Sequence, residues 1–281
     1  MAVTGTDTGP VTGPSLHFLG HSTVRVELAG TTVLSDPLLT AGIGPVRRVV
    51  APLPPATWAG VDLVLISHLH NDHLHLPSLR RLGRGTPVVV PRGAGRWLRG
   101  KGFTAVEELA PGGSLTHGRL TVTATDADHS AHRWGPRFTH GPHAPAVGHL
   151  VSGGGSSVYL AGDTDLFPGM ADLGADGVDV AALPVWGWGP SLGPGHLDPH
   201  RAAEAVALLR PRVAVPVHWG TLAIRGLTTL PGPWRARMRA LLTEPPRTFA
   251  AAVAAGGSGA AVALTAPGSP VQLPPDRGRT T

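Results

Sequence analysis

Residues 61–75, Val-Asp-Leu-Val-Leu-Ile-Ser-His-Leu-His-Asn-Asp-His-Leu-His, decide how the rest of the chain is interpreted. The apolar run at 61–66 predicts a buried strand, and four histidines and a carboxylate follow it directly. Imidazole and carboxylate groups are common protein ligands of zinc and similar divalent metals. The alternative is a His-rich surface turn with adventitious metal affinity, which the strand leading into the motif disfavours.

The spacing within this motif suggests two metal ions. His68 and His70 lie two residues apart, so on an extended segment their side chains face the same way and can share one ion. Asp72 and His73 follow as the chain turns toward an expected helix at 76–82. They can therefore reach a second ion nearby.

Composition limits the chemistry that is available. The 281 residues include no cysteine, which excludes disulfides, thiolate ligands and cysteine nucleophiles. The net charge of +5 could favour an anionic substrate or a nucleic-acid surface. The arginines are scattered and form no long basic run, so solvated faces are the default and a nucleic-acid partner is disfavoured. Because the chain has no cysteine, a metal site must use nitrogen and oxygen donors.

The chain suggests one main domain. We expect a disordered leader at residues 1–15, a domain at 16–273 and a tail at 274–281. Residues 1–14 are rich in Thr, Gly and Pro and lack the charged and apolar regions of a signal peptide, so we expect none there. No stretch approaches the roughly 20 apolar residues that a membrane-spanning helix requires. We therefore expect a cytoplasmic protein with no membrane span.

Periodicity and turn residues predict alternating strands and helices. The expected strands are 16–19, 23–28, 32–34, 61–66, 87–90, 105–109, 114–117, 120–125, 146–151, 157–160, 178–183, 213–217 and 262–264. The expected helices are 76–82, 94–101, 166–173, 199–209 and 233–242. Long loops are expected at 38–58, where the loop could line a cleft, and at 126–145 and 185–198. The two halves share an order of strands, a polar strand end and a helix, which suits two packed sheets flanked by helices.

Three further metal-ligand candidates lie at or just beyond predicted strand ends: His129, Asp163 and His218. Gly162 and Gly220 stand next to two of them and would let the backbone turn tightly. Polar residues at successive strand ends converge along one sheet edge, which is a usual place for an active site.

The pattern His-x-His-x-Asp-His, then a lone His, an Asp and a final His, resembles that of the metallo-β-lactamase superfamily. The resemblance implies an α+β fold, the four-layer αββα sandwich, with a one- or two-metal site on one edge. It implies metal one on His68, His70 and His129, and metal two on Asp72, His73 and His218. Asp163 would bridge the two ions.

Within that superfamily the chain is similar to the branch that contains ascorbate-6-phosphate lactonase and N-acyl-phosphatidylethanolamine-hydrolysing phospholipase D. The similarity rests on residues 19–23, 34–37, 129–133, 195–199 and 216–221. His75 stands where that branch usually has an aspartate, and the branch's long aromatic N-terminal features are absent. These departures disfavour a phospholipid substrate.

We therefore expect a dinuclear metal-dependent hydrolase whose metal-bridging hydroxide cleaves a small ester, lactone or phosphodiester. Zinc is the first expectation and manganese the second, because an all-N/O site does not enforce zinc. Asp72 would hold metal two and orient the nucleophile, and His196 would protonate the leaving group. Two alternatives stay open: a nuclease-like phosphodiesterase, and a catalytically silent metal-binding sensor or scaffold. The expected partner is a small, possibly anionic, molecule.

The remaining candidates have a structural interpretation beside the functional one. His196 could equally be a loop residue that bonds backbone. His21 and Asp36 either lie near the metals, with Asp36 fixing a histidine tautomer, or serve only at turns. Arg133 either binds a substrate anion or forms a salt bridge at the rim. Trp186 and Trp188 either wall an apolar pocket or pack in the core. His75 and His132 are expected to be exposed or to stand behind the ligands. Arg47 and Arg48 either contact an anion or lie on a solvated loop, and the solvated loop is the expectation.

Overall fold

A computed structural model describes residues 13–134, 140–175, 177–229 and 232–275. Most of the expected leader and tail therefore lies outside the described residues. Ser15, which we assigned to the leader, is buried and begins the first strand. None of the helices in these ranges is long and apolar enough to cross a membrane.

The first sheet has seven strands in the order β19-β1-β2-β3-β6-β7-β8. Strands β1 to β3 form an antiparallel meander, and β3, β6, β7 and β8 run parallel. The bounds are β1 (Ser15–Gly20), β2 (Thr23–Leu28), β3 (Thr31–Ser35), β6 (Leu63–Leu65), β7 (Val88–Pro91), β8 (Val106–Leu109) and β19 (Pro270–Gln272).

The second sheet also has seven strands, in the order β18-β16-β15-β14-β13-β10-β9. Here β9, β10, β13 and β14 are antiparallel, whereas β14, β15, β16 and β18 are parallel. The bounds are β9 (Ser114–His117), β10 (Leu120–Asp126), β13 (Val147–Gly153), β14 (Ser156–Leu160), β15 (Val180–Pro184), β16 (Val213–Val217) and β18 (Ala261–Val262).

Side chains from both sheets form one apolar core between them, because alternate residues of each strand face inward. Leu16, Phe18 and Val26 from the first sheet join Val122 and Val151 from the second, and all five are fully buried. This core holds the two sheets face to face.

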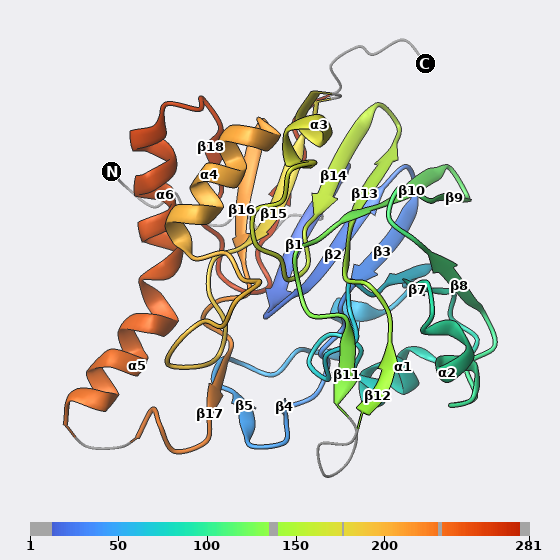
Figure 1. Cartoon of the computed structure of the whole chain (residues 1–281), viewed down its shortest axis with the longest axis horizontal. Helices are drawn as coiled ribbons and strands as arrows, with labels where there is room; N and C mark the ends of the chain where they lie inside the picture. The colour runs from blue at the N-terminus through green and yellow to red at the C-terminus, as the bar shows by residue number, and fades with distance from the viewer. Residues whose placement is uncertain (1–12, 135–139, 176, 230–231, 276–281) are drawn as a thin grey trace.

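Helices cover the outer face of each sheet (Figure 1). Helices α1 (Leu76–Leu82) and α2 (Gly95–Arg99) pack on the first sheet, and α3 (Met170–Ala175), α4 (Pro199–Leu209) and α6 (Pro245–Gly256) pack on the second. Helix α5 (Pro233–Thr243) lies at the periphery beside α6 and buries only Met238. The layers follow the order helix, sheet, sheet, helix, so the predicted four-layer αββα sandwich is correct.

Several elements begin and end at the predicted residues because local sequence features determine their ends. Helix α4 is one of them: Pro199 occupies its first turn, and the Asp198 side chain accepts hydrogen bonds from the N–H groups of His200 and Arg201. Helix α1 likewise begins at Leu76 with a proline in its first turn.

Two expected loops contain short strands instead. The segment 126–145 includes β11 (His132–Trp134) and β12 (His140–His143), which pair as a hairpin. The segment 38–58 includes β4 (Gly42–Ile43), β5 (Val46–Arg48) and the 3-10 helix η1 (Pro55–Trp58). Strand β5 pairs with β17 (Leu222–Ile224), a partner far away in sequence, so local patterns could not indicate it.

Helix α6 was not predicted. Its Ala-rich sequence ends in glycines and lacks a polar stripe. In the structure Phe249 and Val253, one helical turn apart, are buried in the apolar cluster that α4 also joins. Tertiary packing therefore stabilises this helix.

Candidate metal centre

The seven predicted ligands lie at one edge of the sandwich, where strands of both sheets end. His68, His70, Asp72 and His73 follow β6 of the first sheet. The other three come from the second sheet, just beyond β10, β14 and β16: His129, Asp163 and His218. Carboxyl ends of parallel strands converge at one edge, so the fold brings these distant residues together.

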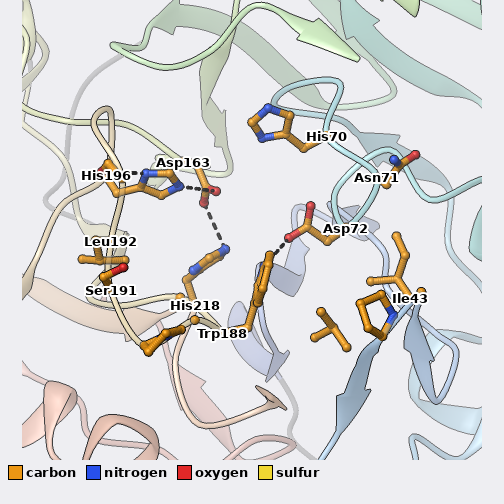
Figure 2. A pocket seen from close by; sticks show the side chains of 17 residues that line it. Ile43, His70, Asn71, Asp72, Asp163, Trp188, Ser191, Leu192, His196 and His218 are labelled. Carbon is orange, nitrogen blue, oxygen red and sulfur yellow. Dashed lines mark hydrogen bonds and ion pairs between the residues drawn. The ribbon is translucent and has the colours of Figure 1, made fainter. Parts of the chain in front are cut away.

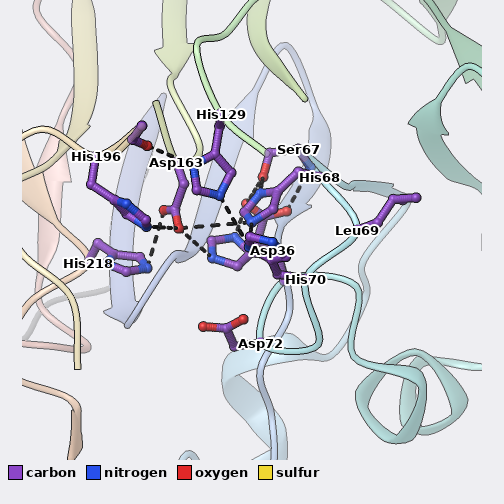
Figure 3. Close-up of polar contacts among 12 residues, drawn as sticks. Asp36, Ser67, His68, Leu69, His70, Asp72, His129, Asp163, His196 and His218 are labelled. Atoms are coloured by element: carbon purple, nitrogen blue, oxygen red, sulfur yellow. Dashed lines mark hydrogen bonds and ion pairs between the residues drawn. The ribbon is translucent and has the colours of Figure 1, made fainter. Parts of the chain in front are cut away.

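Three imidazole nitrogens meet at the position expected for metal one. His70 Nδ1 lies 3.0 Å from His68 Nε2 and 3.2 Å from His129 Nε2. Figure 3 shows the rings of His68 and His129 turned toward His70. Three neutral imidazoles cannot satisfy one another at a single point, whereas a cation accepts all three lone pairs.

A second group stands at the position expected for metal two. Ligand atoms of Asp72, His73 and His218 lie within 4.8 Å of one another, and His21 belongs to the same group. His21 Nε2 lies 3.1 Å from Asp72 Oδ2. His21 therefore lies at the candidate site, where its side chain contacts Asp72.

Asp163 lies between the two groups. Its Oδ1 is 3.2 Å from His218 Nε2, and its Oδ2 is 3.2 Å from His73 Nε2 and 3.9 Å from His68 Nε2. A carboxylate that faces imidazoles of both groups has the placement that a bridging ligand requires.

Hydrogen bonds on the opposite ring nitrogens orient several of these imidazoles. His73 Nδ1 lies 3.0 Å from Asp36 Oδ2, and Asp36 also accepts from the Ser67 N–H and hydroxyl. The Nδ1 atoms of His129 and His218 face the carbonyls of Gly195 and Trp186. Each such bond places a proton on Nδ1 and leaves Nε2 free to bind a metal. The Asp36 carboxylate is therefore placed to accept a hydrogen bond from His73 Nδ1.

Burial keeps most of the candidate histidines neutral. Desolvation lowers the pKa of His70 to about 4 and that of His218 to about 3. Burial opposes the charge on Asp163, but attraction from His218 and His73 outweighs it and holds the carboxyl pKa well below its usual range. A neutral imidazole and an ionised carboxylate are the forms that bind metals.

The donor set also fits metal ions because some of its buried atoms lack hydrogen bonds. His73 Nε2, His218 Nε2 and Asp163 Oδ1 are buried and have no hydrogen-bond partner among the described residues. Buried polar atoms normally have a hydrogen-bond partner, and imidazole nitrogens and carboxylate oxygens that face one another in this way form a donor set that a divalent cation can satisfy. The residues present are those that divalent ions prefer.

A pocket of about 720 Å³ opens over the second group (Figure 2). Asp72, Asp163, His196 and His218 lie at its base or wall, and Trp188 stands beside them with its indole nitrogen directed toward Asp72. The rest of the wall comes mainly from residues 43–46 and the loop 187–193. The loop 38–58 thus lines a cleft, as predicted.

His196 reaches the site, although it also bonds backbone. Its Nε2 lies 3.5 Å from Asp163 Oδ2, and its Nδ1 faces the carbonyls of Gly193 and Pro194. Burial disfavours its charged form, but the hydrogen bond and attraction of Asp163 outweigh burial and raise the pKa of His196.

Arg133 occupies neither of its two predicted positions. It is only 8% exposed, and its Nη1 donates to the carbonyls of Leu69 and Leu74 at 2.8 and 2.9 Å. Its guanidinium also lies 5.0 Å from the ring centroid of Trp97. Arg133 therefore holds the His-rich loop from behind, away from the rim.

The other second-rank candidates take different positions. Trp188 lines the pocket, but Trp186 contributes its carbonyl to His218 while its indole donates to the Gly189 carbonyl. His75 is buried, and its Nδ1 lies 2.7 Å from Ser78 Oγ at the start of α1. Arg48 donates to the carbonyls of Leu19 and Ala51.

One polar residue of the neighbourhood was missed. His149 in β13 is 1% exposed, and neither ring nitrogen has a hydrogen-bond partner among the described residues. It lies two residues from both Val147 and Val151, which belong to the core between the sheets, so its side chain shares their face of β13. The position of His149 between two apolar residues of the same strand face was the sequence signal that could have indicated its burial.

Comparisons with known proteins agree with this geometry. Residues 31–219, more than half of the chain, match the family described as the beta-lactamase superfamily domain. A metal-dependent hydrolase from Opitutus terrae is 36% identical over 208 residues, which cover 73% of this chain and 85% of that protein. N-acyl-phosphatidylethanolamine-hydrolyzing phospholipase D 1 from Caenorhabditis elegans is 28% identical over 246 residues, covering 78% of this chain and 67% of that protein.

A solved structure gives the same result. That of a metallo hydrolase from the archaeon Ignicoccus hospitalis aligns with a TM-score of 0.68 and 26% identity, covering 92% of this chain and 98% of that one. The fold and the His/Asp clusters define a metal-dependent hydrolase. The chain belongs to the metallo-β-lactamase superfamily, as its motifs predict.

Proposed function

We propose that the protein uses two divalent metal ions to hydrolyse an ester or lactone that carries an apolar group. The observation that carries this proposal is the composition of the pocket over the metal centre. Its wall includes Ile43, Pro45, Val46, Trp188, Pro190 and Leu192. Burying apolar surface there contributes roughly 25 cal/mol per Å² to binding.

The same wall disfavours a phosphate substrate. None of the described residues that line the pocket is an arginine or lysine. The nearby Arg47 and Arg48 donate to the carbonyls of Gly44 and Leu19. Arginine is over-represented where proteins recognise a phosphate, because its forked donors match the phosphate oxygens. An uncharged acyl substrate suits this pocket better than a phosphodiester does.

The proposed roles follow from the contacts. Asp72, His73 and His218 would hold one ion, His68, His70 and His129 the other, and Asp163 would contact both. When bound, such ions supply Lewis acidity and lower the pKa of water to near neutrality. Asp72 would orient the attacking group. His196, which lines the pocket beside Asp163, would hand a proton to the leaving oxygen.

Two other functions give different results in the same assay. A nuclease-like phosphodiesterase would need a basic groove leading to the metals, and among the residues that the structure describes no arginine or lysine lines the pocket. A metal-binding sensor would keep the ligand set but show no turnover. Metal content alone cannot separate a sensor from an enzyme, whereas turnover can.

The test is metal analysis of the purified protein, followed by chelation and restoration with zinc or manganese separately. Activity is measured on p-nitrophenyl esters of increasing acyl length, on lactones and on bis-(p-nitrophenyl) phosphate. We expect about two ions per chain, loss of activity on chelation, and the highest kcat/KM on acyl substrates with an apolar chain. Preference for the phosphodiester would favour the alternative. A fully loaded protein with no turnover would favour the sensor, and a protein that binds no metal would overturn the proposal.

A further inference from the structure

We propose that Trp188 is a positioning residue: its indole N–H fixes one oxygen of Asp72 and so sets how that carboxylate faces the metal centre. This inference deepens the proposed function and rests on it. It gives the apolar wall of the pocket a second task, since the side chain that would contact the substrate also holds a ligand.

The contact is directional. Trp188 Nε1 lies 3.1 Å from Asp72 Oδ2. An indole nitrogen can only donate and an ionised carboxylate can only accept, so the direction of this hydrogen bond does not depend on a tautomer. Figure 2 shows the indole reaching across the pocket floor to the carboxylate.

A second donor reaches the same oxygen from another part of the chain. His21 Nε2 also lies 3.1 Å from Asp72 Oδ2. Two donors on Oδ2 would fix the rotation of the carboxylate and would leave Oδ1 available to a metal ion. This is how groups behind a ligand usually tune it: they set its orientation and its charge.

The indole is itself held in place from behind. Its ring packs against a small apolar cluster that contains Leu38, Val46 and Leu222. These residues lie in or next to the sheet formed by β4, β5 and β17. Trp188 is therefore anchored on that sheet.

Two roles of Trp188, lining the pocket and positioning Asp72, can be told apart by one substitution. A phenylalanine at this position would keep an aromatic wall for the substrate but would lose the N–H group. If the wall were the only role, Trp188→Phe would leave the metal centre unchanged. If the N–H positions Asp72, the same change weakens the metal centre and slows turnover.

The experiment compares wild type, Trp188→Phe and the matched control Trp234→Phe, which makes the same chemical change at a residue that is 50% exposed in α5. The first readout is competition for bound metal with a chelator of known affinity, and it needs no substrate. We expect Trp188→Phe to hold one of its ions roughly 10- to 100-fold more weakly, and the control to match wild type.

The second readout is steady-state kinetics on the best acyl substrate. We expect kcat of Trp188→Phe to fall by a similar factor while KM changes by less than about threefold, because the aromatic wall stays. Unchanged metal affinity and unchanged kcat would overturn the inference. So would a rise in KM alone, which would assign Trp188 to the wall only.

A third measurement guards against a folding defect. Thermal unfolding of the metal-free proteins should be the same for wild type and Trp188→Phe. A lower unfolding temperature with unchanged metal affinity would mean that Trp188 only packs the loop, and would also overturn the inference. If wild type binds two ions but hydrolyses nothing on the panel, the proposed function fails, while the competition assay still decides the role of Trp188.

Discussion

The backbone N–H of His218 donates to the backbone carbonyl of His21 at 2.8 Å, and both residues have left-handed backbone conformations, with φ of 64° and 55°. The N–H of His21 in turn donates to Thr221 Oγ1. Non-glycine residues seldom adopt positive φ, so these two are held there by their partners. The two sheets are thus joined at the candidate metal centre, where His21 directs its ring to Asp72.

Removal of a ligand tests the metal assignment most directly. Asp72→Ala should cut hydrolysis by roughly 100-fold or more, because it removes both a donor and the group proposed to orient the nucleophile. Asp72 lies in the turn before α1, outside the core, so the fold should survive. Metal analysis should find about one ion where wild type holds about two. Asp172→Ala, at an exposed position in α3, serves as the control. Near-native turnover would remove Asp72 from the mechanism.

The contact between Asp36 and His73 tests the support behind the ligands. In Asp36→Asn an amide would replace the carboxylate that faces His73 Nδ1 and the Ser67 hydroxyl. We expect roughly 10- to 100-fold weaker metal retention, measured by chelator competition. Asp62→Asn makes the same change at a carboxylate that accepts the backbone N–H of Thr32, and it should retain metal like wild type. Equal retention in both variants would show that Asp36 does not set the tautomer.

Arg133 tests whether the His-rich loop depends on support from behind. Arg133→Met keeps an apolar stem but leaves the carbonyls of Leu69 and Leu74 without this donor. We expect a loss of about 1–3 kcal/mol in the free energy of unfolding of the metal-free protein, measured in urea. Arg80→Met, at an exposed site in α1, should cost little. If the two variants are equally stable, the carbonyls find other partners and Arg133 is not required.

His149 predicts acid sensitivity of the fold. Desolvation lowers its pKa to about 4, against about 6.5 in an unfolded chain. Between these values the unfolded chain binds a proton that the folded chain does not. The stability is therefore complete above pH 6.5 and falls as the pH drops toward 4, by about 3 kcal/mol from this residue.

His149→Leu should remove that part of the pH dependence, and urea unfolding at a series of pH values measures it. His200→Leu, at an exposed position in the first turn of α4, should leave the dependence as in wild type. A His149→Leu profile as steep as that of wild type would assign the acid sensitivity to other groups.

Sequence patterns predicted the elements whose signals are local. Four elements have the expected bounds: strands β2 and β16 and helices α1 and α4. The apolar pattern of the strands and the first-turn prolines of the helices lie within the elements themselves. The pairing of β5 with β17 and the packing of α6 on α4 depend on residues far apart in the chain. No local pattern could have revealed them.

The residues of the candidate site also fall into a predictable and an unpredictable group. The motif spacing and the family resemblance indicated seven candidate ligands, and the structure brings their side chains together at one edge. The support behind them was less predictable. The sequence left two roles open for Asp36, near the metals or only at a turn. Arg133 donates to backbone carbonyls and not to an anion. Trp188 contacts Asp72, from which more than a hundred residues separate it in the chain. Such contacts depend on how loops meet after the sheets have packed.

The division of the ligands between the two sheets has a consequence for cooperativity. An ion shared by His68 and His129, or by His73 and His218, would tie a strand end of one sheet to a strand end of the other. Binding to the native state alone raises its stability by mass action, by about 2.7 kcal/mol at a free ion concentration of 100 Kd. Metal loading would then make the two sheets melt as one unit. A chelator would act as a denaturant of the whole sandwich as well as an inhibitor of its chemistry.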